Sequence, residues 1–132
     1  MSATSRVLMS VSEHLAGFEL GEPVQVTVGA CGDYSAGTIQ LSGACLPELA
    51  GELLVWADTL DDVTASAWRP SCPDDDLVVL ELWGRLTDDT PVRVFGGLLD
   101  GPGVPGLAAG RRVELSWVLV RTWALLAEGL VA

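Results

Sequence analysis

The sequence contains no lysine and a single histidine, His14. All seven basic residues are arginines, and 18 acidic residues bring the formal net charge to −11. A chain of this charge repels phosphate groups, so we expect no nucleic-acid partner. The chain has one histidine and no Gly-x-Ser-x-Gly motif, so it lacks the residues expected of a Ser-His-Asp hydrolase. The sequence therefore favours a non-enzymatic protein, although it does not decide the question.

Cysteine is also scarce, with Cys31, Cys45 and Cys72 as the three examples. Their spacing fits no metal site, and an odd number argues against a closed set of disulfides. We expect free thiols that are mostly buried. The run from Asp74 to Asp76 lacks the D-x-D-x-D-G spacing of a calcium loop. No metal and no cofactor are expected.

Long hydrophobic runs are missing, because no apolar stretch approaches the roughly 18–20 residues of a transmembrane helix. The first ten residues hold only one short apolar run, Val7 to Met9, which is too short for the hydrophobic part of a signal peptide. We therefore expect no membrane contact and a cytoplasmic location. Hydrophobic residues nevertheless make up 49% of the chain, which excludes a disordered protein. The length fits a single domain over residues 1–132.

The N-terminal third reads as strands. Residues 6–11 alternate in character, and residues 17–20 form a short apolar piece. Val24, Val26 and Val28 alternate with polar residues, and residues 36–41 follow as a pairing strand after a turn. On this interpretation His14 lies in an exposed turn between two strands.

The remainder predicts a helix, further strands and a second helix. Leu46, Leu49, Ala50, Leu53, Ala57 and Leu60 form an amphipathic helical stripe, and Asp61-Asp62 follows it. Strands are expected over 64–68, 77–86, 92–98 and 113–119, with a hairpin turn at 87–90. The strand over 77–86 is apolar on both faces, so we expect it to be central. From residue 120 the pattern is helical. The sequence thus predicts an α+β fold, with an antiparallel sheet of about six to eight strands, one central amphipathic helix and a C-terminal helix.

Tryptophan accounts for five of the eight aromatic residues. We expect Trp83 and Trp117 in the core. Trp68 precedes Arg69-Pro70 at a strand end and is the best candidate for a surface anchor, because tryptophan is enriched in interface hot spots. In the C-terminal helix, Trp123 and Leu130 are candidates for an oligomer seam.

The carboxylates gather in turns, which is where aspartate hydrogen bonds locally. Three clusters are candidates for binding a basic protein: Asp61 and Asp62; Asp74, Asp75 and Asp76; and Asp88 and Asp89. Such loops would steer a partner of opposite charge into contact.

Four segments together resemble the small bacterial immunity proteins of the WapI-like type. They are FELGEPVQVTVGACGDYSAGTIQL, similar to paired strands of that family; LPELAGELLVWADTL, similar to its helix; LVVLELWGRLTDDTPVRVFGGLL, similar to its long hairpin; and VELSWVLVRTWALLAEGL, similar to its last strand and helix. The resemblance covers residues 15–131 or so. It implies a protein that neutralises a toxin domain by covering its active site.

Two other functions stay open at this level. The chain could be a homo-oligomeric scaffold, because its apolar fraction is high for an acidic monomer. It could also be a small cyclase or ligand-binding protein with an apolar cavity lined by tryptophan, since such a protein needs no catalytic triad.

Overall fold

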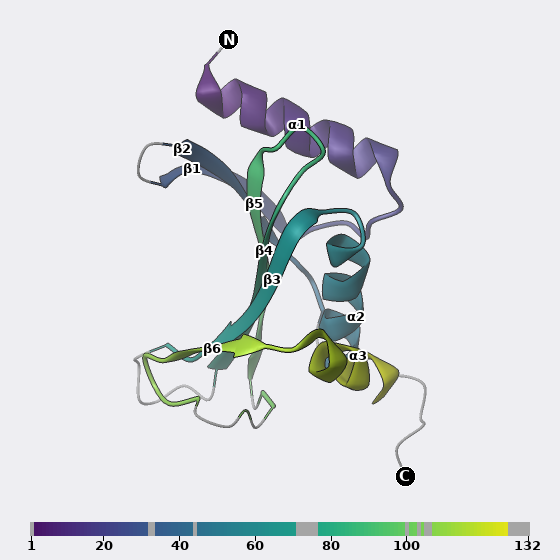
Figure 1. The fold of residues 1–132 in the computed structure, drawn as a ribbon, viewed down its shortest axis with the longest axis vertical. Coiled ribbons are helices and arrows are strands. Elements are labelled where there is room, and N and C mark those ends of the chain that lie inside the picture. Colours follow the sequence, from purple (N-terminus) through teal and green to yellow (C-terminus); the bar gives the residue numbers. More distant parts are fainter. Residues whose placement is uncertain are drawn as a thin grey trace.

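The computed structural model describes residues 2–31, 34–43, 45–70, 77–99, 101–102, 104 and 107–126. Within them the chain forms three helices and six strands (Figure 1). In order these are α1 (Ala3–Gly17), β1 (Gln25–Cys31), β2 (Tyr34–Gln40), α2 (Leu46–Ala57), β3 (Asp61–Trp68), β4 (Leu77–Arg85), β5 (Pro91–Leu99), β6 (Arg112–Leu115) and α3 (Trp117–Leu125). The predicted α+β class is confirmed.

The six strands form one sheet in the order β1-β2-β5-β4-β3-β6. Four of its five pairings are antiparallel, and β2 pairs with β5 in parallel. The prediction of a wholly antiparallel sheet is therefore wrong at this one pairing. It arises because the chain leaves β2 through α2 and returns by the β3, β4 and β5 meander, so that β5 arrives in the same direction as β2.

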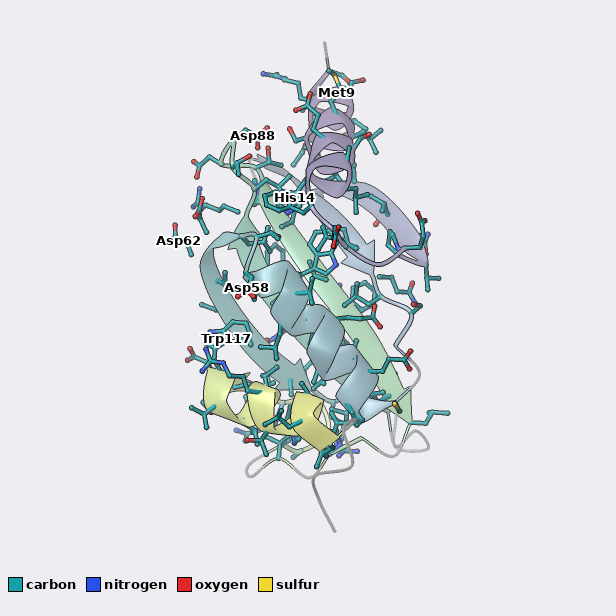
Figure 2. All side chains as sticks on the ribbon, turned by 90° about the vertical axis from the view of Figure 1, so that its right-hand side faces the viewer. Met9, His14, Asp58, Asp62, Asp88 and Trp117 are labelled. Carbon is teal, nitrogen blue, oxygen red and sulfur yellow. The ribbon has the colours of Figure 1, made fainter. Side chains whose placement is uncertain are left out.

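All three helices lie on one face of the sheet (Figures 1 and 2). The predicted stripe of α2 is confirmed, since Leu49, Ala50 and Leu53 are buried in the core. Pro47 stands in the first turn of α2, where its missing N–H costs nothing. The strand β4 is central and buried along most of its length, as its apolar pattern predicted.

The N-terminal strands predicted over 6–11 and 17–20 are wrong: residues 6–11 lie within α1, and residues 18–20 follow the end of α1 without forming a strand. Val7, Val11 and His14 recur at spacings of four and three and are the buried residues of this helix. The Ser2 side chain caps the helix by accepting a hydrogen bond from the backbone N–H of Ser5. The helix packs closely on β2 at Gly37, where an added Cβ would lie 3.0 Å from Val11 Cγ2.

Two further boundaries differ from the prediction. The strand expected over 113–119 ends at Leu115, and Ser116 caps α3, so Trp117 and Leu119 are helical. Asp61 and Asp62 begin β3, since α2 ends at Ala57.

The described helices are too short, or not apolar enough, for any of them to cross a membrane.

Candidate functional site

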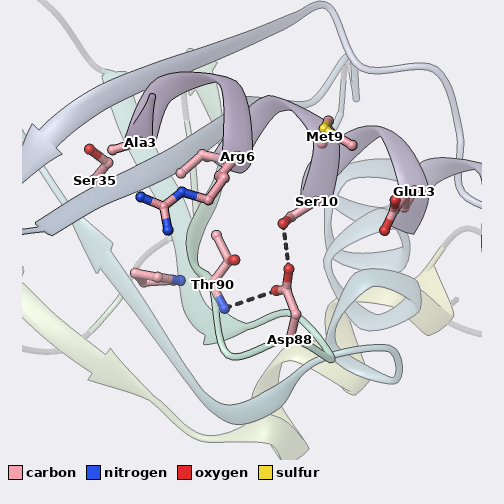
Figure 3. A pocket seen from close by; sticks show the side chains of 10 residues that line it. Ala3, Arg6, Met9, Ser10, Glu13, Ser35, Asp88 and Thr90 are labelled. Atoms are coloured by element: carbon pink, nitrogen blue, oxygen red, sulfur yellow. Dashed lines mark hydrogen bonds between the residues drawn. The ribbon is translucent and has the colours of Figure 1, made fainter. Parts of the chain in front are cut away.

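The helix α1 and the β4–β5 turn border an open hollow of about 670 Å³ at one end of the sheet (Figure 3). Polar side chains from both elements line it, including Arg6, Ser10 and Glu13 of α1 and Asp88 and Thr90 of the turn. The sequence interpretation missed this site because it placed strands where α1 lies. The signal that could have found it is the spacing of Arg6, Ser10 and Glu13, which puts them on one face of a helix.

Asp88 is held by hydrogen bonds from two elements. Its carboxylate accepts a hydrogen bond from the Ser10 hydroxyl and a second, of 3.1 Å, from the Thr90 backbone N–H. The Ser10 bond is the main reason that the pKa of Asp88 lies below its usual value; partial burial opposes it, and the Thr90 bonds add to it. Asp88 is therefore a fixed negative charge that also ties α1 to the turn.

The neighbouring carboxylates surround Arg85. Its guanidinium lies 3.1 Å from Asp89 and 3.9 Å from Asp62, both of them highly exposed. Asp61 lies opposite Arg85 in the β3–β4 register, beside a bulge. Asp62 and Asp89 adopt positive φ angles of 52° and 74°, which aspartate tolerates better than most residues.

The structure thus brings together two of the three predicted aspartate clusters. We call this set, with the neighbouring glutamate of α1, the acidic end: Glu13, Asp61, Asp62, Asp88 and Asp89. The third cluster, Asp74, Asp75 and Asp76, lies outside the described residues.

Trp68 does not adjoin the acidic end. It stands at the opposite end of β3 from Asp61, about 23 Å along the strand. Its ring is half-buried beside the Arg112 guanidinium carbon, 5.8 Å from the ring centre, and its buried Nε1 has no hydrogen-bond partner in the structure as described. Trp68 is therefore separated from Asp61 and Asp62, and its role as an anchor stays a prediction, because Asp74, Asp75 and Asp76 lie outside the described residues.

Of the other tryptophans, Trp83 and Trp117 were expected in the core and are half-buried. Trp123 is 7% exposed and packs in the core of its own chain, so its side chain offers little surface to a second subunit. Leu130, the other residue of the predicted seam, lies outside the described residues. Cys45 is a free thiol and is exposed, which is contrary to the expectation of burial.

His14 is buried beneath the hollow and links α1 to the end of α2. Its Nε2 lies 2.8 Å from the Thr59 hydroxyl oxygen, and that hydroxyl donates to the Trp56 carbonyl at 2.7 Å. Nε2 must therefore carry the proton, and the buried Nδ1 has no partner among the described residues. The ring also stacks on Trp56 with centroids 5.7 Å apart. The expectation of an exposed turn histidine is wrong, because the helix turns this residue inward.

Burial lowers the pKa of His14, with the charge of Asp88 as a smaller opposing effect. The unfolded chain therefore binds a proton more readily than the folded one. We predict that the contribution of His14 to the free energy of unfolding is constant above about pH 6.5, the ordinary histidine value, and falls as the pH drops below it. Because His14 is the only histidine, one imidazole NMR signal reports its titration directly. A midpoint at or above the ordinary value would contradict the prediction, and His14→Leu should remove this part of the pH dependence.

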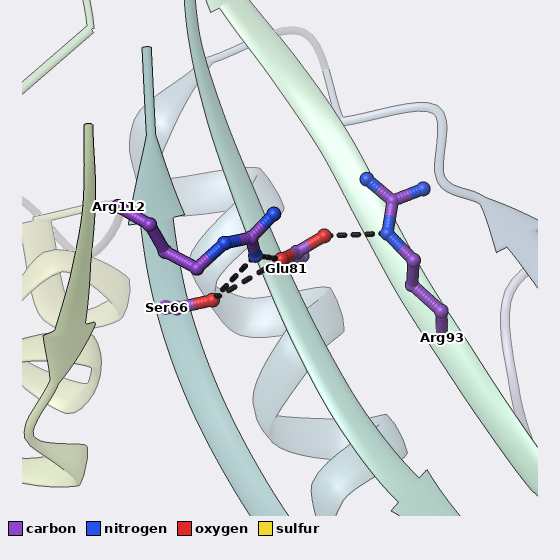
Figure 4. A network of polar contacts seen from close by, with 4 residues as sticks. All are labelled: Ser66, Glu81, Arg93 and Arg112. Atoms are coloured by element: carbon purple, nitrogen blue, oxygen red, sulfur yellow. Dashed lines mark hydrogen bonds and ion pairs between the residues drawn. The ribbon is translucent and has the colours of Figure 1, made fainter. Parts of the chain in front are cut away.

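A second polar cluster lies in the middle of the sheet (Figure 4). The Glu81 carboxylate is fully buried, at 0% exposure, and forms ion pairs with Arg93 of β5 and Arg112 of β6. Ser66 of β3 donates to the same carboxylate at 3.3 Å and accepts from Arg112 at 3.2 Å. The sequence interpretation did not select these residues. The available signal was Glu81 itself, a charged residue within the apolar strand predicted to be central.

The described residues include no group of three or more His, Cys, Asp or Glu side chains that could hold a metal ion. Two smaller hollows, of about 400 and 350 Å³, each contact one tryptophan, Trp117 and Trp56 respectively. Neither is a cavity lined by several tryptophans, so the predicted apolar ligand site stays a prediction.

Comparison with known proteins adds no relative to this description: no protein-family model matches the chain, and no curated protein or solved structure is similar to it.

Proposed function

We propose that the chain is a non-enzymatic protein-binding domain whose acidic end docks onto a basic surface of another protein, as an immunity protein covers the active site of a toxin. The observation that carries this proposal is the hollow between α1 and the β4–β5 turn. It places Glu13 and Asp88 around a concave surface at the end of the sheet where Asp62 and Asp89 also lie.

Arg6 lines one side of the hollow and Glu13 the other (Figure 3). The Glu13 side suits a long basic side chain, because Met9 offers apolar contact for the methylene stem of an arginine or lysine, and Glu13 and Asp88 offer carboxylates for its charged head. The hydrogen bonds from Ser10 and Thr90 hold the Asp88 carboxylate in place before binding, so little side-chain entropy is lost at that residue.

The overall charge acts at longer range. A net charge of −11 attracts a basic protein, and exposed carboxylates at one end orient the encounter. Steering of this kind raises the association rate at low salt and weakens as salt screens it.

The experiment measures binding to a basic toxin domain encoded beside this gene, by stopped-flow kinetics and by protection of growing cells. We predict that the double variant Glu13→Gln/Asp88→Asn lowers the affinity by about tenfold, with a large part of the loss in the association rate at low salt. The matched control is Glu19→Gln/Glu22→Gln, which removes the same charge from two exposed positions outside the hollow.

An affinity that falls equally in both double variants would attribute the effect to net charge and refute a role for the hollow. Unchanged binding by Glu13→Gln/Asp88→Asn, or a neighbouring toxin domain that the wild-type chain does not bind, would refute the proposal itself.

A further inference from the structure

The helix α1 is attached to the rest of the molecule by a small number of contacts. Its buried residues are Val7, Val11 and His14. In the part of the chain that the structure describes, two side-chain hydrogen bonds join α1 to other elements, one through Ser10 and one through His14. The helix takes no part in the sheet, and residues 18–24, which follow it, form no helix or strand. It can therefore separate from the sheet without breaking a strand pairing.

The His14 ring lies where α1 meets the end of α2 (Figure 2). The residue is 4% exposed, and its ring centroid lies 4.6 Å from that of Phe18 and 5.7 Å from that of Trp56. Nε2 donates its proton to the Thr59 hydroxyl, so a second proton has to enter at the buried Nδ1, which has no partner among the described residues. The cationic ring would then hold a buried N–H that nothing accepts.

The charges around His14 do not make up for this loss. The strands β1 and β2, on which α1 packs, contain no Asp, Glu, Arg or His. The C-cap residue of α2, Asp58, is exposed, as is Glu19, and Glu13 of α1 lines the hollow. From the β4–β5 turn, Asp88 attracts a charged His14 ring, but this attraction is smaller than the effect of burial.

We propose that protonation of His14 releases α1 from the sheet, so that the hollow exists near neutral pH and is lost in mild acid. Release would take the Ser10 hydroxyl away from Asp88 and remove Arg6 and Glu13 from the hollow. It would also bring the ring into water, which accepts from both of its N–H groups. The proposal rests on the proposed function only for its consequence, which is that a basic partner held by Glu13 and Asp88 would dissociate in acid.

The docked and the released ring bind protons with different affinity. The ring of a released α1 titrates near the ordinary histidine value of about 6.5, whereas burial lowers the pKa of His14 in the docked helix. The equilibrium constant for release is therefore lowest above about pH 6.5 and rises by up to about tenfold per pH unit below it, until the docked ring is also protonated. Asp88 stays charged over this range, because its pKa lies below the ordinary value of 3.8.

Hydrogen exchange of the full chain between about pH 7 and pH 5 tests the release. At each pH the amides of α1 should open at least about tenfold more often than those of the central strand β4, because release needs less free energy than global unfolding. After correction for the intrinsic exchange rate, the opening constant of α1 should increase by about three- to thirtyfold as the pH falls. No partner protein is present, so this test can fail or succeed whether or not the proposed function holds.

Two variants separate the effect of the imidazole from that of the other bond. His14→Gln keeps an N–H donor for the Thr59 hydroxyl and has no group that titrates, so the opening constant of α1 should not change with pH over this range. The matched control is Ser10→Ala, which removes the bond to Asp88. It should raise the opening constant by about tenfold at every pH and leave the pH dependence in place.

An α1 that still opens more often in acid when it carries His14→Gln would overturn the proposal, because a different group would then be titrating. If His14→Gln does not fold, the wild-type chain decides the question. Equal opening constants for α1 and β4 would mean that the helix leaves only when the whole chain unfolds. That result would overturn the proposal, and so would an opening constant of wild-type α1 that does not change with pH.

Discussion

Replacing both Arg93 and Arg112 with leucine is expected to lower the free energy of unfolding by about 3–5 kcal/mol. The Glu81 carboxylate is fully buried in the central strand β4, and these two guanidiniums are its ion-pair partners among the described residues. Without them, folding would place a charged group away from water with only the Ser66 hydroxyl to bind it. Urea denaturation with a fixed m-value measures the loss.

The triple variant that also carries Glu81→Leu should regain most of this stability. It removes the stranded charge instead of leaving it unpaired, and a hydrophobic residue suits a buried position of a central strand. Arg85→Leu provides a matched control, because Arg85 pairs with exposed aspartates and its loss should cost less than about 1 kcal/mol. If the double variant is as stable as Arg85→Leu, the network does not hold Glu81 in the ionised form.

Glu81 also shows what a single sequence can reveal. A charged residue inside a strand that is apolar on both faces has to find partners, so its position alone indicates a buried polar network. The identity of those partners was beyond prediction. Arg93 and Arg112 reach Glu81 because β4 pairs with β5 and β3 pairs with β6, and this order of strands depends on contacts made far along the chain.

The elements that were predicted correctly carry long, regular patterns. The stripe of α2 extends over twelve helical residues, and the hairpin of β4 and β5 combines two apolar strands with an acidic turn. The strand predicted over residues 6–11 was wrong because a helical and a strand period fit so short a segment equally well. Over the longer span, Val7, Val11 and His14 follow only the helical one.

Because α1 was not predicted, most of the candidate site could not be predicted either. Two aspartate clusters were recognised, but without α1 there was no hollow beside Asp88 and no role for Ser10 or Glu13.

The packing of α2 on the sheet gives the last prediction. Gly96 of β5 faces α2, and a Cβ added there would lie 2.5 Å from Leu49 Cδ1. Leu49 is fully buried, so its side chain has no free space to move into. Gly96→Ala should therefore lower the free energy of unfolding by about 1–3 kcal/mol through overpacking. Gly51→Ala provides the matched control: it lies on α2 with no atom near its added Cβ, and it should stabilise the protein by up to about 1 kcal/mol.

Combining Gly96→Ala with Leu49→Ala measures the contact between these two residues. Leu49→Ala alone should cost about 2–5 kcal/mol, because it leaves a cavity between α2 and β5. In the double variant the methyl group added by Gly96→Ala occupies part of the space that Leu49 vacates, so the combined loss should be smaller than the sum of the two single losses by about 0.5–3 kcal/mol. Purely additive losses would contradict this packing, since they would mean that residues 49 and 96 do not meet. A coupling of the expected sign would place α2 directly on β5, and with it the face of the sheet that the helices cover.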